Sequence, residues 1–146
     1  MNRIVIGCDH GGFEYKEMIK EYLLEKDYEI IDAGCYDKSS VDYPDVALKV
    51  ANTVNEENVR GIIICGTGIG ISISANKCHG IRAALCLNEY MAKMARNHND
   101  SNVLALGQRV MGIGLALSIV DTWLEATFDG GRHENRVHKM MKMEGE

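Results

Sequence analysis

Residues 61–72 read Gly61-Ile62-Ile63-Ile64-Cys65-Gly66-Thr67-Gly68-Ile69-Gly70-Ile71-Ser72, and this stretch decides the fold. Three consecutive β-branched isoleucines are typical of a strand buried on both faces, as in a parallel sheet. The apolar run stops at a cysteine, after which glycines occupy alternate positions. We expect a strand, a tight loop and the start of a helix, where bare backbone N–H groups can receive an anion.

The glycine loop does not match the known nucleotide-binding loops. A P-loop requires Gly-Lys-Ser/Thr, but Ile71 and Ser72 follow Gly70. The dinucleotide fingerprint requires glycine where Ile71 stands, and a phosphatase loop of the Cys-x5-Arg kind requires arginine there. The sequence therefore predicts a cradle for a small anion with a thiol at its edge.

Composition narrows the class of protein. The 146 residues suit one domain, 1–146, and a net charge of −5 gives no basic footprint for nucleic acid or an anionic membrane. No apolar run approaches the ~18 residues of a membrane span, and no signal-peptide pattern precedes the first strand. Five cysteines, odd in number and without a C-x-x-C, argue against disulfides and structural zinc. We expect a cytoplasmic protein.

Strand and helix patterns alternate along the chain. Helices are predicted where apolar residues recur every three to four positions, and strands where short apolar runs end at polar or glycine-rich turns. This alternation predicts one three-layer, Rossmann-like α/β domain, with a mostly parallel five-stranded sheet and helices on both faces. The expected strands are 4–8, 29–32, 61–64, 81–87 and 103–106, and the expected helices are 15–23, 44–54, 69–77, 89–96, 113–124 and one from Arg132.

Parallel strands place their carboxyl ends at one edge of a sheet. Asp9 and His10, Cys65 with its glycines, and the loop 107–109 should therefore lie together. A buried cysteine is usually a small hydrophobic residue, but a thiol facing a helix N-terminus is favoured as the reactive thiolate. The other four cysteines lack this setting, and we interpret them as packing or surface residues.

Histidine and arginine supply the remaining candidate groups. His98 lies in the polar loop 97–102, where a solvated and a functional role fit equally well. Arg132 and Arg136 share one helical face after two glycines, an arrangement that suits a phosphate but also a solvated face. His79 and His138 are interpreted as surface residues. The sequence shows no metal-ligand spacing and no Ser/His/Asp triad, so no metal site is predicted.

Together, a thiol base, histidines, an anion-stabilising loop and paired arginines are the parts needed to isomerise a phosphorylated sugar through an enediolate. The chain also resembles type B ribose-5-phosphate isomerases over essentially its whole length. The motifs that carry the resemblance are GCDHGG (7–12), DYP (42–44), CGTGIGISI (65–73) with ANK (75–77), GIRA (80–83), NHND (97–100), NVLA (102–105), and GGRH (130–133) with RV (136–137).

The resemblance implies roles for particular residues. Cys65 would move the proton between C1 and C2, Thr67 and the loop amides would hold the enediolate, and His98 would open the furanose ring. The family is dimeric or tetrameric, with each site built from two subunits, and the 98–99 loop and Arg109 are expected from the neighbour. No metal or cofactor is implied. The remaining substrate-binding residues implied are Asp9, His10, Tyr43, Gly66, Gly68, Ile69, Gly70, Asn99, Arg109, Arg132 and Arg136.

Three functions stay open at this stage. The first is interconversion of ribose 5-phosphate and ribulose 5-phosphate in pentose phosphate metabolism. The second is isomerisation of galactose 6-phosphate or allose 6-phosphate, because isomerases of those sugars share the fold and part of the motif pattern. The third, from another class, is a non-catalytic phosphosugar-binding module.

Overall fold

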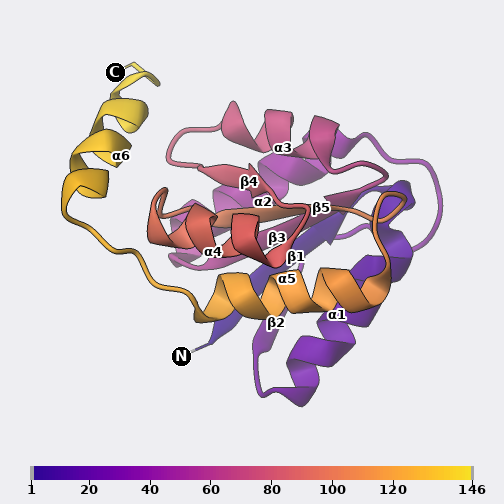
Figure 1. The fold of residues 1–146 in the computed structure, drawn as a ribbon. Helices are drawn as coiled ribbons and strands as arrows, with labels where there is room; N and C mark the ends of the chain where they lie inside the picture. Colours follow the sequence, from indigo (N-terminus) through magenta and orange to yellow (C-terminus); the bar gives the residue numbers. More distant parts are fainter. Residues whose placement is uncertain (1, 146) are drawn as a thin grey trace.

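Five parallel strands form the sheet at the centre of the computed structural model, which describes residues 2–145 (Figure 1). Their order is β2-β1-β3-β5-β4, so the chain starts near the middle and crosses over to both sides. All neighbouring pairs are parallel, as predicted. The strands are β1 (Arg3–Cys8), β2 (Glu29–Asp32), β3 (Arg60–Cys65), β4 (Ala83–Leu85) and β5 (Val103–Gly107).

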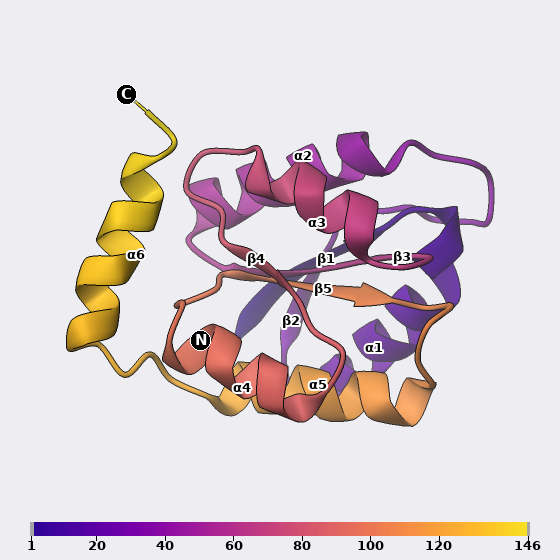
Figure 2. The ribbon, with the colours of Figure 1, turned by 45° about the horizontal axis from the view of Figure 1, so that its top comes forward.

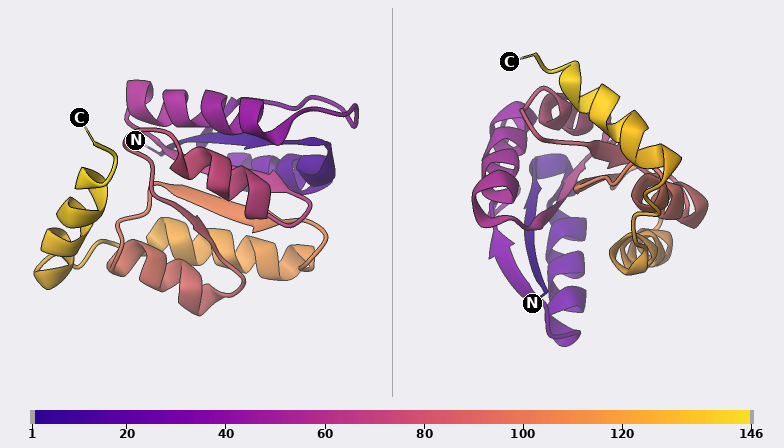
Figure 3. Two further views of the ribbon diagram at one scale, coloured as in Figure 1. Left: turned by 90° about the horizontal axis from the view of Figure 1, so that it is seen from above. Right: turned by 90° about the vertical axis from the view of Figure 1, so that its left-hand side faces the viewer.

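Helices cover both faces of the sheet, which confirms the three-layer prediction (Figure 2). On one face lie α1 (Phe13–Glu25), α4 (Glu89–Asn97) and α5 (Ile113–Glu125), and on the other lie α2 (Tyr43–Glu57) and α3 (Ile69–Asn76). The last helix, α6 (Arg132–Lys142), stands outside these layers, at the side of the molecule (Figure 3). None of the helices in residues 2–145 is long and apolar enough to cross a membrane.

The alternation of side chains along β3 divides the hydrophobic core in two. Ile62 and Ile64 point into the cluster formed with α1, α4 and α5, whereas Ile63 and Cys65 point into the cluster beneath α2 and α3. All three isoleucines are fully buried. Burial on both faces explains why this strand reads as an unbroken apolar run.

The edge strand β4 is shorter than the predicted strand 81–87. The side chain of Asn76 accepts a hydrogen bond from Ala83 N at 2.7 Å and donates one to Ala83 O at 2.9 Å. In addition, Asn102 Oδ1 accepts from Arg82 N at 2.8 Å. Asparagine side chains therefore satisfy the backbone where the strand was expected to begin, and regular pairing starts only at Ala83.

An ion pair between α1 and β2 connects the loop after β2 to the end of β1. Lys16, fully buried, donates to both oxygens of Asp32 at 3.0 and 2.9 Å, and Lys20 donates to the same carboxylate at 2.9 Å. Asp32 also accepts from Gly34 N at 2.9 Å, and Gly34 O accepts from Cys8 N at 2.6 Å. These contacts therefore link the ion pair to Cys8, the residue that precedes Asp9.

The ion pair also shifts the pKa values of Asp32 and Lys16. Burial alone would raise the pKa of Asp32, but hydrogen bonds from Lys16 and Lys20 outweigh it and hold that pKa below its ordinary value. Likewise, burial alone would lower the pKa of Lys16, but hydrogen bonds to Asp32 and Glu17 raise it. Because the folded pKa of Asp32 is depressed, its contribution to stability is present at neutral pH and disappears as pH falls through that pKa.

We expect Asp32→Asn to lower the free energy of unfolding by about 3 kcal/mol at pH 7, because the charge of Lys16 then stays buried with less compensation. Lys16→Met should cost less, since it removes the buried charge itself. Urea unfolding at pH 7 and pH 3.5 checks both, and the Asp32→Asn penalty should shrink at the lower pH. Equal penalties at both pH values would contradict this account.

Candidate active site

Three loops meet in close backbone contact at the carboxyl edge of the sheet. A Cβ atom added to Gly11, after β1, would lie 3.1 Å from Gly66 N, and one added to Gly107, at the end of β5, would lie 2.5 Å from Thr67 O. Side chains at these positions would push the loops apart. The glycines therefore bring the ends of β1, β3 and β5 together, as the parallel topology predicted.

Cys65 lies at the centre of this edge. Its side chain is 5% exposed, and Sγ accepts a hydrogen bond from Gly68 N at 3.0 Å. Gly68 has a φ of +81°, the left-handed region that favours glycine, and begins α3 without a side-chain cap. The thiol therefore receives an N–H group at an uncapped helix N-terminus.

Thr67 and Ile69 complete the loop above the helix. Thr67 Oγ1 accepts from Ile69 N at 3.2 Å, so its hydroxyl hydrogen is free to donate elsewhere. Thr67 is exposed. The Thr67 hydroxyl thus lies at the start of α3, where helix N–H groups without intrahelical partners can stabilise a negatively charged oxygen.

Asp9 and His10 lie on the neighbouring loop after β1. Asp9, 7% exposed, accepts from Gly11 N through Oδ1 at 2.8 Å, and its own N–H donates to Ile64 O at 3.2 Å. His10 Nδ1 accepts from Val41 N at 3.3 Å. In the neutral ring this leaves the proton on Nε2, which can donate to a ligand oxygen.

Tyr43 and Arg109 border the same loop. A Cβ atom on Gly70 would lie 2.7 Å from the Tyr43 ring, and one on Gly66 would lie 3.1 Å from a terminal nitrogen of Arg109. Arg109 N also donates to Gly66 O at 2.9 Å. β5 ends beside β3, so Arg109 lies beside the glycine loop of its own chain. The expectation that Arg109 also serves the site of a neighbouring subunit stays a prediction.

The other predicted residues lie at the opposite edge of the sheet. His98 and Asn99 follow α4 and precede β5, so they lie where the strands begin, and Arg132 and Arg136 are on α6 (Figure 2). The five residues of β5 separate the two edges by about 15 Å, at ~3.3 Å per residue. One chain therefore does not bring these four residues to Cys65.

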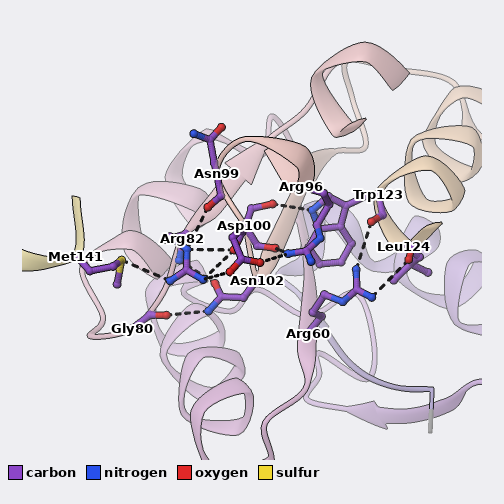
Figure 4. Close-up of polar contacts among 11 residues, drawn as sticks. Arg60, Gly80, Arg82, Arg96, Asn99, Asp100, Asn102, Trp123, Leu124 and Met141 are labelled. Atoms are coloured by element: carbon purple, nitrogen blue, oxygen red, sulfur yellow. Dashed lines mark hydrogen bonds and ion pairs between the residues drawn. The ribbon is translucent and has the colours of Figure 1, made fainter. Parts of the chain in front are cut away.

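Arginines hold the His98 loop in place (Figure 4). Arg82 donates to the carbonyls of Asn99 and Asp100, at 3.2 Å and as short as 2.8 Å respectively. Arg96 donates to Asp100 Oδ1 at 2.9 Å and to Ser101 O at 2.6 Å. The backbone next to His98 is thus fixed by several charge-assisted hydrogen bonds.

His98 has two neighbours that the sequence did not reveal. Its ring stacks on His133, with centroids 4.1 Å apart and planes 10° from parallel. Asp129 joins them, and ligand atoms of all three residues lie within 4.8 Å of one another. No spacing in the sequence indicated this grouping, because His98 lies more than 30 positions before Asp129 and His133 and meets them only through the fold. The expectation that the protein holds no metal stays a prediction.

Electrostatic effects lower the pKa of His133. Partial desolvation is the largest cause of the lowered pKa, followed by the electrostatic effects of His98, Arg132 and Arg136, while Asp129 acts in the opposite direction. A neutral His133 is thereby favoured at neutral pH. The sequence signal that could have drawn attention to this residue is its place directly after Gly130-Gly131-Arg132.

Two surface cavities lie away from the carboxyl edge. One of about 590 Å³ is lined by Arg60, Arg82 and Arg96 where the strands begin, and one of about 560 Å³ lies between α6 and β4. Cys65 lines neither. In the first cavity Arg60 donates to the carbonyls of Trp123 and Leu124 at the end of α5, which gives it a structural role (Figure 4).

The fold and the candidate site define a Rossmann-like α/β protein with a thiol beside a glycine-rich loop at the carboxyl edge. The sequence profile of the Ribose/Galactose Isomerase family matches residues 4–140. The chain therefore belongs to the ribose/galactose isomerase family.

Individual relatives are similar to this chain over nearly its full length. Ribose-5-phosphate isomerase B of Escherichia coli (strain K12) is 50% identical over 145 residues, 99% of this chain and 97% of the relative. The structure of Clostridium thermocellum ribose-5-phosphate isomerase B superimposes with a TM-score of 0.96, at 58% identity and 97% coverage of both chains. That of Mycoplasma genitalium ribose-5-phosphate isomerase B with bound ribulose 5-phosphate gives a TM-score of 0.94, at 41% identity, covering 99% of this chain and 97% of that one.

The contact between Gly70 and Tyr43 gives a prediction for the site. Gly70→Ala should keep or slightly raise the melting temperature, because alanine is about 1 kcal/mol better than glycine inside a helix. Ribulose 5-phosphate, the ligand of the Mycoplasma genitalium relative, serves as the probe, and we expect it to bind about tenfold more weakly to Gly70→Ala because the new methyl group displaces the Tyr43 ring. Calorimetric titration measures the affinity. Gly114→Ala in α5 is the matched control, since no atom lies within 4 Å of the added Cβ. Unchanged affinity in Gly70→Ala would mean that Tyr43 does not contribute to ligand binding.

Proposed function

We propose that this chain interconverts ribose 5-phosphate and ribulose 5-phosphate as an aldose-ketose isomerase. The observation that carries the proposal is the Cys65 thiol, which accepts the Gly68 N–H beside an uncapped helix N-terminus. Its support is the full-length similarity to enzymes named ribose-5-phosphate isomerase B, one of them with ribulose 5-phosphate bound.

Cys65 is the proposed base for the carbon-to-carbon proton transfer. Its thiolate removes the proton from C2 of the open-chain aldose, the C–H electron pair forms a C1=C2 double bond, and the carbonyl electrons move to O1. Thr67 and the loop amides stabilise this enediolate. The thiol then returns the proton to C1 while a proton moves from O2 to O1, which gives the ketose.

His98 is the proposed acid for ring opening. It donates a proton to the ring oxygen of the furanose as the bond from that oxygen to C1 breaks, and the 1-hydroxyl passes its proton to water to leave the aldehyde. Asp9, Tyr43 and Asn99 would contact the sugar hydroxyls. His10, Arg109, Arg132 and Arg136 would hold the phosphate, where guanidinium groups provide paired donors.

A site shared between two chains reconciles these roles with the geometry. Cys65 and His98 lie at opposite edges of the sheet, which the length of β5 separates by about 15 Å. In a two-fold symmetric dimer, a contact from the carboxyl edge of one chain to the amino edge of its partner occurs twice. We therefore propose a homodimer, or a tetramer built from such dimers, with two composite sites per pair.

The proposed chemistry needs no metal ion or cofactor, because N–H and hydroxyl donors carry the oxyanion charge. Cytoplasmic carbohydrate metabolism, and within it the pentose phosphate pathway, is the proposed setting. The absence of a disulfide pattern among the five cysteines and the pentose phosphate named for the relatives support this setting.

Isomerase assays test the function directly. We expect turnover of ribose 5-phosphate to exceed that of allose 6-phosphate and galactose 6-phosphate, and to be indifferent to EDTA. Cys65→Ala should lower kcat about 10²- to 10⁴-fold with a small change in KM, which is the range expected when a general base is removed.

Cys78→Ala provides the matched control, because Cys78 lies just beyond the other end of α3 and donates weakly to Ser74 O. Its activity should equal that of the wild type. Preference for a hexose phosphate would assign the chain to the galactose-6-phosphate or allose-6-phosphate isomerases instead. No turnover of any of the three sugars would favour the non-catalytic binding module, and full activity in Cys65→Ala would mean that another group is the base.

A further inference from the structure

His98, Asp129 and His133 form a compact cluster beside α6. They come from the end of α4, the segment before α6 and the first turn of α6. Asp129 N donates to Asn97 O at 2.9 Å, which ties the segment to α4. Gly130 and Gly131 follow with positive φ values of 68° and 58°, a conformation that favours glycine. The chain therefore turns sharply and returns His133 onto His98.

The donor set of this cluster suits a first-row divalent cation. Two imidazole nitrogens and one carboxylate oxygen are the three protein ligands of many zinc sites that keep a fourth position open. Imidazole favours zinc, copper and nickel over magnesium or calcium, which prefer oxygen ligands. We propose that a zinc-type divalent cation binds His98, Asp129 and His133 and thereby inhibits the isomerase reversibly.

The cluster reaches coordination geometry through small side-chain movements. Its candidate ligand atoms lie within 4.8 Å of one another, whereas bonds of ~2.0–2.1 Å in a tetrahedron place ligand atoms about 3.4 Å apart. Asp129 is exposed and the two rings are half-buried, so side-chain rotation can supply the difference. The stacked rings must also open, because each nitrogen lone pair lies in the plane of its own ring.

Charge around the cluster limits the affinity. Asp129 contributes one negative charge, but Arg132 and Arg136 contribute positive charge to the environment of His133. We therefore expect binding in the micromolar range, weaker than that of structural zinc sites. Such an ion would act as a readily reversible inhibitor.

The inhibition rests on the proposed function, whereas the binding does not. A cation on an imidazole nitrogen of His98 occupies the atom proposed to protonate the ring oxygen. Ring opening would then stop, although Cys65 and its loop would be unchanged. Binding is therefore measured on the resting protein, without substrate, and inhibition in a separate assay.

Calorimetric titration of the full chain with Zn²⁺ tests the site. We expect one ion per chain, with affinity at least tenfold weaker in Asp129→Asn and in His133→Gln. Glu134→Gln and His138→Gln, two exposed α6 residues outside the cluster, should bind like the wild type. Cys65→Ala should also retain the ion, and Co²⁺ in its place should show the absorption of nitrogen and oxygen ligands without a thiolate charge-transfer band.

The activity assay uses Asp129→Asn, whose basal turnover of ribose 5-phosphate should stay close to that of the wild type. Zn²⁺ should inhibit the wild type reversibly, with EDTA restoring activity, and should inhibit Asp129→Asn only at concentrations at least tenfold higher. The proposal is overturned if no ion binds, if both cluster variants bind as tightly as the wild type, or if Cys65→Ala abolishes binding. Binding without inhibition would leave the site intact and contradict only its effect on the enzyme.

Discussion

The parallel direction of all five strands is the constraint on which the rest of the structure depends. It places the ends of β1, β3 and β5 at one edge and the loop that carries His98 at the other. A fully buried strand of three isoleucines sets this arrangement, because both of its faces require a layer of helices. The positions of the candidate site residues follow from where each lies relative to a strand.

Close backbone packing turns the carboxyl edge into a site. Glycines after β1 and at the end of β5 allow these segments to touch the loop after β3. That loop then directs Gly68 N at the Cys65 thiol. The ion pair of Lys16 and Asp32 also stabilises this edge, because Asp32 binds Gly34 and Gly34 binds the end of β1. A charged pair between α1 and β2 thus helps to position Asp9.

The strand, glycine loop and helix after residue 61 could be predicted because their residue types express local requirements. The edge strand β4 could not be bounded, since Asn76 and Asn102 replace its backbone partners with side chains. The cluster at His98 was missed because it is assembled by a turn between distant segments. The place of Arg109 at the carboxyl edge could be predicted, because this residue follows shortly after a strand.

Complementation between two inactive variants tests the central claim, that each site combines opposite edges of two chains. Cys65→Ala and His98→Asn chains are unfolded, mixed in equal amounts and refolded together. Random pairing yields hybrids with one site carrying both substitutions and one site carrying neither, so activity should return to about a quarter of the wild-type value. Activity no higher than the average of the two variants would contradict the shared site and require His98 to act within its own chain or not at all.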